Sequence, residues 1–349
     1  MERGISSMRD YVCAPDQDVV ISSRVRLSRN YEDLPFSPKL TPEYADEVID
    51  RTAKAVFSSK HGASFMLLRM RDLENDARNR LVEHHLISYD LLKYASRSAA
   101  MVSSAGTISV MLNEEDHVRF QGLLPGLQLE RSAEMALTLD EKVGDDYPYA
   151  FDSQWGFLTA CPANTGTGMR ACVILHLPAL AAAGQMGAVM QSVAKLGLNI
   201  RGMYGDGAEA QGQLYQMSNV ATLGRGEEDV VRSLVAATEE IVGHERAMRE
   251  RAEKKDMLQL QDALLRSWGE TMQARLMTTK EFMKRYSDIR YAASLGYLHL
   301  PIPALDLLMM DLQPGSLGVR AGRLIGEREA EILRAKTLRE ELGALTAEV

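Results

Sequence analysis

Short alternating runs of apolar and polar residues fill the chain up to about residue 225, and longer helical patterns follow. Residues 107–112 (Thr-Ile-Ser-Val-Met-Leu) alternate with the period of a half-buried strand. The same pattern predicts further strands at 19–27, 64–69, 157–160, 171–177, 200–204 and 213–217. Helices are predicted at 42–58, 76–88, 126–138 and 180–196. Strands and helices mix without a regular βαβ rhythm, which favours an α+β fold with an antiparallel sheet flanked by helices.

The last third of the chain has an all-helical pattern. A capping box at Thr278 and Glu281 starts one helix. Pro301 and Pro303 start another, which Pro314 and the glycine after it are expected to end, and residues 327–342 form a last helix. We therefore predict two domains: residues 1–253, which contain the sheet, and a small all-α domain at 254–349.

Composition narrows the class of protein. The chain has 349 residues, 46% apolar and 25% charged, which is typical of a globular protein. Its net charge of −8 gives no bulk attraction to nucleic acid. The N-terminus lacks an apolar signal core, and no apolar run is long enough for a membrane span. The three cysteines are too few and uneven for a disulfide framework, so we expect a cytoplasmic protein.

Familiar nucleotide motifs do not account for this chain. No Gly-x4-Gly-Lys-Ser/Thr loop and no His-Arg-Asp or Asp-Phe-Gly triplet occurs. The segment from Gly166 to Ala171 matches Gly-x-Gly-x-x-Ala, but a predicted strand follows it where a dinucleotide site needs a helix. No His/Cys cluster has the spacing of a zinc site.

Arginines stand out, with 29 Arg against 11 Lys. Codon bias explains such a surplus as well as function does. The places of the arginines along the chain must therefore distinguish the two explanations. Arg24 and Arg26 flank Val25 and share one face of a predicted strand, with a spacing that suits two neighbouring phosphates. Arg119, Arg170 and Arg201 also lie at strand ends beside turns. Each one alone fits a surface ion pair, whereas together they indicate an anion site.

Carboxylates and a cysteine lie near these strand ends. Glu114, Glu115 and Asp116 follow the strand at 107–112, where a solvated turn is the simpler interpretation. Asp206 lies between two glycines. Cys161 begins the loop Cys-Pro-Ala-Asn-Thr-Gly-Thr-Gly, whose free amides favour a reactive thiol, although a buried inert cysteine is the commoner outcome.

Five ordered segments resemble the phosphagen (guanidino) kinase family. They are Ser22-Ser-Arg-Val-Arg26, Asn113-Glu-Glu-Asp-His-Val-Arg119, Cys161-Pro-Ala-Asn-Thr-Gly-Thr-Gly-Met-Arg170, Arg201-Gly-Met-Tyr-Gly-Asp-Gly207 and Tyr215-Gln-Met-Ser-Asn219. The resemblance is greatest to the bacterial protein arginine kinases, because family members that act on small guanidino compounds carry a helical domain ahead of the first of these segments. Here that segment begins near residue 20, and a helical domain follows the sheet instead.

The resemblance implies roles for individual residues. Five arginines would hold the ATP phosphates: Arg24, Arg26, Arg119, Arg170 and Arg201. His85 would stack on adenine. Glu115 and Asp206 would orient the guanidinium and take its proton, and Cys161 would contact it. Glu114 and Asp116 would help to organise the water shell of Mg²⁺.

Two departures from the family pattern bear on activity. Asp206 stands where the family usually has Glu, and its side chain is one methylene shorter. The C-terminal Arg-Asp-x-x-Arg-Ala motif of protein arginine kinases, which binds phosphoarginine, is replaced by Ala-Glu-Ile-Leu-Arg-Ala at 330–335. The candidate phosphoarginine pocket is then formed by Arg334, Glu331 and, with a shift of register, Arg328.

The resemblance thus predicts an enzyme that uses ATP and Mg²⁺ to phosphorylate arginine side chains in proteins, marking them for Clp-type proteolysis under stress. It also implies a homodimer, with a heat-shock repressor, a Clp protease and a zinc-binding activator protein as partners. Two alternatives stay open: a guanidino kinase acting on a small molecule, and a weakly active nucleotide-binding adaptor.

Overall fold

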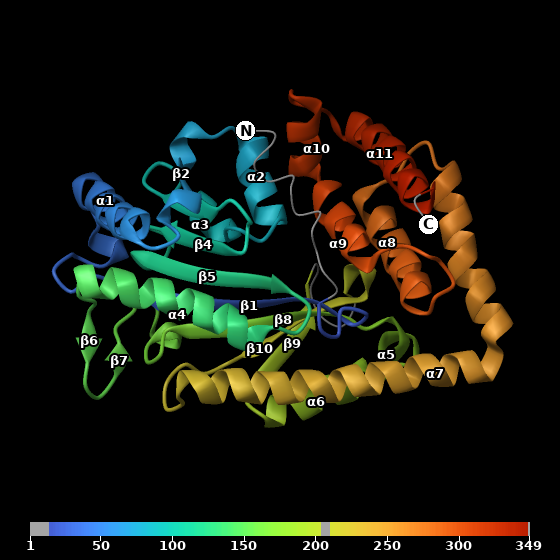
Figure 1. Cartoon of the computed structure of the whole chain (residues 1–349), viewed down its shortest axis with the longest axis horizontal. Helices are drawn as coiled ribbons and strands as arrows, with labels where there is room; N and C mark the ends of the chain where they lie inside the picture. The colour runs from blue at the N-terminus through green and yellow to red at the C-terminus, as the bar shows by residue number, and fades with distance from the viewer. Residues whose placement is uncertain (1–13, 204–209, 348–349) are drawn as a thin grey trace.

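A large antiparallel sheet forms the centre of the molecule (Figure 1). The computed structural model describes residues 14–203 and 210–347. Eight strands pair in the order β2-β3-β4-β5-β1-β8-β10-β9. Their bounds are β1 (Val20–Arg29), β2 (Phe65–Arg69), β3 (Ala99–Ser103), β4 (Ile108–Leu112), β5 (Val118–Pro125), β8 (Met169–His176), β9 (Leu198–Gly202) and β10 (Leu214–Asn219). The hairpin of β6 (Phe151–Asp152) and β7 (Gly156–Phe157) is separate. The expected α+β class with an antiparallel sheet is confirmed.

Strand alternation gives the sheet one apolar and one chemically active face. In β1, Val25 and Leu27 are fully buried in the main core, and Arg24 and Arg26 point to the other side. The same alternation in β8 sends Val173 into that core. The arginine-bearing face is therefore a direct result of the period-two pattern in two central strands.

Helices cover the apolar face, with α4, α6 and α7 beneath the sheet as drawn (Figure 1). The helices of the sheet-containing part are α1 (Pro42–Ser58), α2 (Asn75–Glu83), α3 (Tyr89–Lys93), α4 (Leu129–Asp146), α5 (Pro178–Ala182) and α6 (Met186–Lys195). The start of α1 follows its sequence: Thr41 Oγ1 accepts a hydrogen bond from the amide of Tyr44, and Pro42 occupies the first turn.

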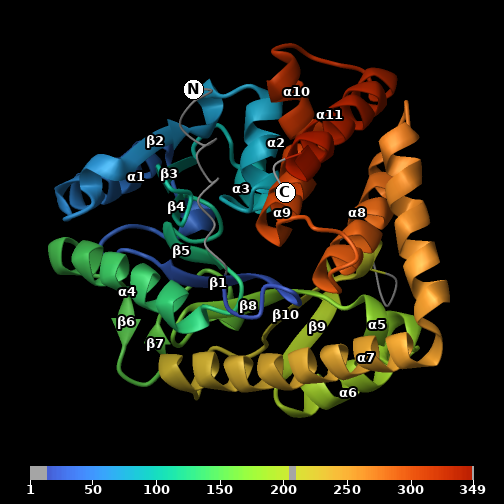
Figure 2. The same ribbon diagram turned by 45° about the vertical axis from the view of Figure 1, so that its right-hand side comes forward.

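The C-terminal helices, with the last part of α7, form a second core above the arginine-bearing face. They are α7 (Glu227–Gln273), α8 (Thr279–Ser294), α9 (Ile302–Asp311), α10 (Pro314–Ala321) and α11 (Glu327–Ala347). Helix α7 runs under the sheet and then turns upward (Figure 2), with a non-helical φ of −161° at Asp256. The second core includes Phe282, Leu317 and Leu342, and it reaches the sheet at Ile174 and Leu214.

Several sequence predictions of secondary structure were wrong. Strands β3 and β5 were not predicted. Strand β3 is buried along its whole length, so its sequence does not alternate. The expected strand at 157–160 shrinks to Gly156–Phe157. The expected helix at 180–196 is two helices, separated at Gly184, whose φ is +68°. The helix expected at 76–88 ends at Glu83, and that expected from residue 126 begins at Leu129. Pro314 begins α10 rather than ending α9, since proline suits the first turn of a helix.

No helix among the described residues is both long enough and apolar enough to cross a membrane.

Candidate active site

Four of the five candidate phosphate-binding arginines lie on adjacent central strands. Arg26 of β1 is directly opposite Arg170 of β8, and Arg119 of β5 is opposite Ser28 of β1. Arg24 lies two residues before Arg26, opposite Cys172. On the outermost strand, Arg201 of β9 is exposed and pairs with Gln216 of β10. The antiparallel register therefore places residues from four segments on one face of the sheet.

Few carboxylates balance this positive charge. Burial, together with the neighbouring charges of Arg24 and Arg119, lowers the pKa of Arg26 to about 9, and its Nε has no hydrogen-bond partner among the described residues. Arg24 Nε donates to the sulfur of Cys172 at 3.2 Å, and Arg170 donates to the carbonyl of Asn219 at 3.2 Å. Arg24 and Arg170 thus have neutral partners, and Arg26 has an orphaned donor, which makes this cluster a site for an anion.

The three consecutive carboxylates have different surroundings. Glu114 is 1% exposed and is ion-paired with Arg119. Asp116 accepts hydrogen bonds from the side chain of Asn30 at 2.8 Å and from the amide of Ala160 at 2.7 Å. The Glu115 side chain is 46% exposed, and its Oε2 lies 3.4 Å from Arg119. Glu115 is therefore the carboxylate of this trio that is open to a second substrate.

The loop before β8 connects Glu115 to the arginines. Cys161 is half-buried with a free thiol, and its carbonyl accepts the amide of Asn164 at 2.9 Å. The Asn164 side chain donates to Glu115 Oε2 at 3.3 Å and accepts from Arg170 at 3.5 Å. Sequence reasoning did not single out Asn164, because an asparagine within a Gly-rich loop gives no signal beyond turn formation.

His85 lies above the same face, immediately after α2. Its φ of +59° is unusual for a residue other than glycine. Its carbonyl accepts the side chain of Gln121 at 2.8 Å, and Gln121 is opposite Arg26 in the register. Burial, with the charges of Arg24 and His84, lowers the pKa of His85 to about 3. The imidazole is therefore neutral at physiological pH and presents a flat, uncharged ring.

Asp206, the second candidate catalytic carboxylate, lies outside the described residues. The structure thus brings together Glu115, the Cys161 loop and the arginines of the central strands, and leaves the Asp206 assignment as it stood.

The candidate phosphoarginine residues lie at a separate cavity, lined by residues of α2, α10 and α11, with about 770 Å³ of space including open solvent. Glu331 and Arg334 line it. Arg334 is nearly buried and donates to the carbonyls of Leu312 and Met277, both at 2.8 Å, and burial lowers its pKa. Arg328 is exposed, and its guanidinium pairs with Glu331 at 3.2 Å.

A sheet face that combines clustered arginines with a half-exposed carboxylate and a free thiol defines a phosphotransferase that works on a cationic acceptor. The particular family follows from sequence comparison. Residues 47–248 match the ATP:guanido phosphotransferase C-terminal catalytic domain, and residues 257–349 match the protein-arginine kinase McsB C-terminal domain. The chain belongs to the ATP:guanido phosphotransferase family.

Curated relatives match nearly the whole chain. A protein-arginine kinase of Caldanaerobacter subterraneus subsp. tengcongensis is 39% identical over 329 residues, which cover 94% of this chain and 98% of that protein. A protein-arginine kinase of Geobacillus stearothermophilus is 40% identical over 331 residues, with 94% and 91% covered.

Solved structures share the fold of about two thirds of the chain. Substrate-free duplicated taurocyamine kinase from Schistosoma mansoni superimposes with a TM-score of 0.57 at 25% identity, covering 67% of this chain and 35% of that one. Lombricine kinase gives a TM-score of 0.58 at 24% identity, with 69% and 70% covered, and this likeness concerns the fold alone.

Proposed function

We propose that this enzyme transfers the γ-phosphoryl group of ATP to arginine side chains in proteins. The observation that carries the proposal is the pairing of the arginine-bearing sheet face with the half-exposed Glu115, joined through Asn164. Arginines neutralise the phosphates, and an accessible carboxylate receives the guanidinium group. The names of relatives that match 94% of the chain support a protein-borne acceptor.

The chemistry requires a base because a guanidinium nitrogen is not nucleophilic while protonated. As Glu115 takes a proton from the attacking nitrogen, a bond forms between that nitrogen and the γ-phosphorus. The bond between the γ-phosphorus and the β,γ-bridging oxygen breaks, and ADP leaves with the electron pair. Cys161 contacts the guanidinium, and Asp206 is proposed as the second carboxylate that orients it.

The arginines do most of the positioning in this proposal. Arg24, Arg26, Arg119, Arg170 and Arg201 hold the phosphates in line with the acceptor, which lowers the barrier by alignment and charge neutralisation. Magnesium supplies further charge neutralisation when it binds with the nucleotide. Asp116 fits a place in its water shell, because Oδ2 is buried without a hydrogen bond among the described residues. Glu114 is ion-paired with Arg119, so it would influence the water shell of Mg²⁺ through that arginine.

The direct test measures phosphate transfer from ATP to an arginine-rich protein and to free arginine. We expect a phosphoramidate on the protein, recognised because acid removes the phosphate. Transfer to free arginine with none to proteins would instead establish the small-molecule alternative.

The same assay distinguishes the adaptor alternative. We expect Asp206→Ala to abolish transfer while ATP binding persists, since the substitution removes a carboxylate and no phosphate ligand. Equal, near-zero turnover in the wild type and in Asp206→Ala, with ATP bound by both, would favour the adaptor.

Further proposals rest on the resemblance to protein arginine kinases. They are a homodimer in the cytoplasm, a stress role with a heat-shock repressor, a Clp protease and a zinc-binding activator as partners, and a phosphoarginine pocket at Arg328, Glu331 and Arg334. The division into domains at residues 253 and 254, predicted from the sequence pattern, is also proposed, and it lies close to the kink of α7 at Asp256.

A further inference from the structure

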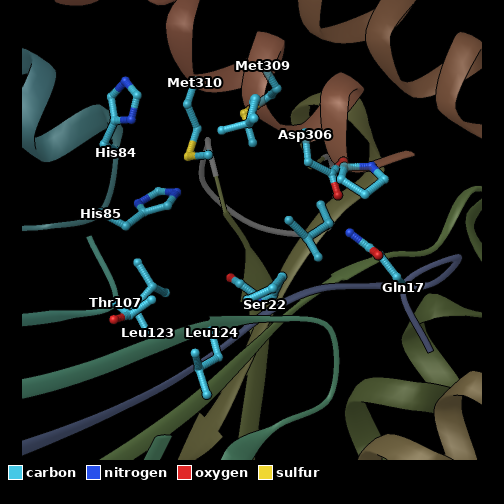
Figure 3. Close-up of a pocket in the computed structure, with 14 residues that line it drawn as sticks. Gln17, Ser22, His84, His85, Thr107, Leu123, Leu124, Asp306, Met309 and Met310 are labelled. Atoms are coloured by element: carbon cyan, nitrogen blue, oxygen red, sulfur yellow. The ribbon is translucent and has the colours of Figure 1, made fainter. Parts of the chain in front are cut away.

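A cavity lies between the sheet and helix α9, where the arginine-bearing face meets the C-terminal helices (Figure 3). Together with the open solvent at its mouth, it holds about 590 Å³ of space. The sheet contributes Ser22 and Leu123, the segment after α2 contributes His85, and α9 contributes Leu307 and Met310. Three parts of the chain that are distant in sequence therefore enclose one space.

This cavity lies at one end of the arginine row, by which we mean Arg24 and Arg26 on one face of β1. Along β1, the side chains of Arg26, Arg24 and Ser22 follow one another on the same face at roughly 6–7 Å intervals. Leu123, which lines the cavity, is opposite Arg24 in the register. A nucleotide whose phosphates lie on Arg24 and Arg26 therefore has its base in this cavity when its acceptor end faces Glu115.

The chemistry of the walls suits a flat heterocycle. Leucine and methionine side chains supply apolar surface, and the neutral ring of His85 supplies an aromatic face. Two wall atoms, Ser22 Oγ and His85 Nε2, are buried with no hydrogen-bond partner in the part of the chain that the structure describes. Unpaired polar atoms in an otherwise apolar wall mark places where a ligand with donors and acceptors gains affinity.

A buried arginine connects helix α9 to the segment that leads into the sheet. Asp306 of α9 pairs with the buried Arg290 at 2.7 Å, and Arg290 also donates to the carbonyls of Gln17 and Asp18 ahead of β1, at 2.8 and 2.9 Å. One guanidinium thus joins α8, α9 and the segment that leads into the sheet. The wall that α9 presents to the cavity is fixed relative to the arginine row.

We propose that α9 of the C-terminal part forms one wall of the nucleotide-base subsite, with Met310 as a binding residue that packs on the base. Met310 and His85 both point into the cavity (Figure 3). The C-terminal helices are then part of the ATP site as well as a separate core. This inference rests on the proposed function, because it takes ATP as the ligand of the arginine row.

The test compares ATP with inorganic tripolyphosphate, which has the phosphates but no base. Met310→Ala in the full chain is expected to weaken ATP binding roughly fivefold to thirtyfold, from the loss of apolar contact with the base. Tripolyphosphate affinity is expected to stay unchanged. Met310→Leu, which keeps the volume, is expected to retain most of the affinity for ATP. The control is Met257→Ala, because Met257 is 56% exposed on α7, and we expect no effect on either ligand.

The possible results separate the base subsite from the proposed function. Unchanged ATP affinity in Met310→Ala would overturn the inference and leave the proposed function in place. An equal loss for ATP and tripolyphosphate would also overturn it, because the substitution would then act on the arginine row or on folding. A wild-type protein that binds tripolyphosphate as tightly as ATP would show that no base subsite exists. Failure of the wild type to bind either ligand would overturn the proposed function itself, and the inference with it.

Discussion

At the scale of single residues, the surroundings of each carboxylate at residues 114–116 determine whether it can contact a substrate. Glu114, Glu115 and Asp116 are neighbours in the sequence, yet only the middle one is substantially exposed. The flanking two are held by Arg119 and by Asn30 with Ala160. A buried carboxylate with fixed partners cannot follow a substrate, whereas Glu115 can.

We therefore expect Glu115→Gln to lower kcat by roughly 10²–10⁴-fold, because a neutral amide cannot accept the guanidinium proton. The affinity for ATP should change little, since Glu115 does not hold a phosphate. Glu134→Gln is the matched control, because Glu134 is exposed on α4. Initial rates of protein phosphorylation, with ATP binding measured separately, check this expectation. A variant with wild-type kcat would remove Glu115 from the proposed base role.

Sequence reasoning reached most of these residues but not their partners. Arg24 and Arg26 were recognisable because two positions in one strand share a face by geometry alone. The pairing of Arg26 with Arg170, and of Arg24 with Cys172, depends on strand register across about 145 residues, which a local pattern does not encode. The role of Asn164 could not be predicted for the same reason. Its side chain matters because it hydrogen-bonds to both Glu115 and Arg170, which are distant in sequence from each other.

At the scale of elements, α2 and α10 join the two parts of the molecule. The Glu83 carboxylate at the end of α2 accepts hydrogen bonds from the amides of Gly315 and Ser316, both at 2.7 Å, which caps the first turn of α10. His84 lies 3.2 Å from Asp311 at the end of α9. The segment that positions His85 is thus fastened to the C-terminal helices.

Close packing of these two helices requires glycine at residue 315. A β-carbon built there would lie 2.5 Å from Cβ of Asn79 and 3.0 Å from the amide nitrogen of Arg80. We expect Gly315→Ala to lower the free energy of unfolding by about 1–3 kcal/mol, because α10 must move away from α2.

The control for this change is Gly343→Ala in α11, where a β-carbon meets no atom of the described residues within 4 Å. That substitution should stabilise the protein by roughly 0.5–1 kcal/mol through helix propensity alone. Urea denaturation of both variants provides the measurement. Similar effects of the two changes, in size and sign, would contradict the close-packing account.

At the scale of the whole molecule, pattern predicted the class of fold, and long-range contacts determined how its parts join. The antiparallel sheet and the C-terminal helices follow from periodicity, with β3, β5 and α10 as the omissions. The docking of α9 over the arginine-bearing face depends on Arg290, which the sequence presents as one more arginine on an amphipathic helix. Only tertiary structure distinguishes Arg290, which is buried and has several partners, from the many arginines in exposed ion pairs.

Arg290 therefore offers a test of how the two parts of the molecule depend on each other. Arg290→Met leaves the carboxylate of Asp306 buried without its main cation, which should cost about 3–5 kcal/mol of stability. Since α9 then loses its fixed place above the sheet, ATP affinity should fall by more than tripolyphosphate affinity in protein that remains folded.

The matched control is Arg266→Met, because Arg266 is 70% exposed and pairs only along its own helix with Asp262 among the described residues. Surface pairs of this kind contribute about 0–1 kcal/mol, so both stability and binding should stay near those of the wild type. Thermal unfolding and ligand titration of the two variants give the comparison. If Arg290→Met lost stability but kept the preference for ATP over tripolyphosphate, Arg290 would hold the molecule together without shaping the base subsite.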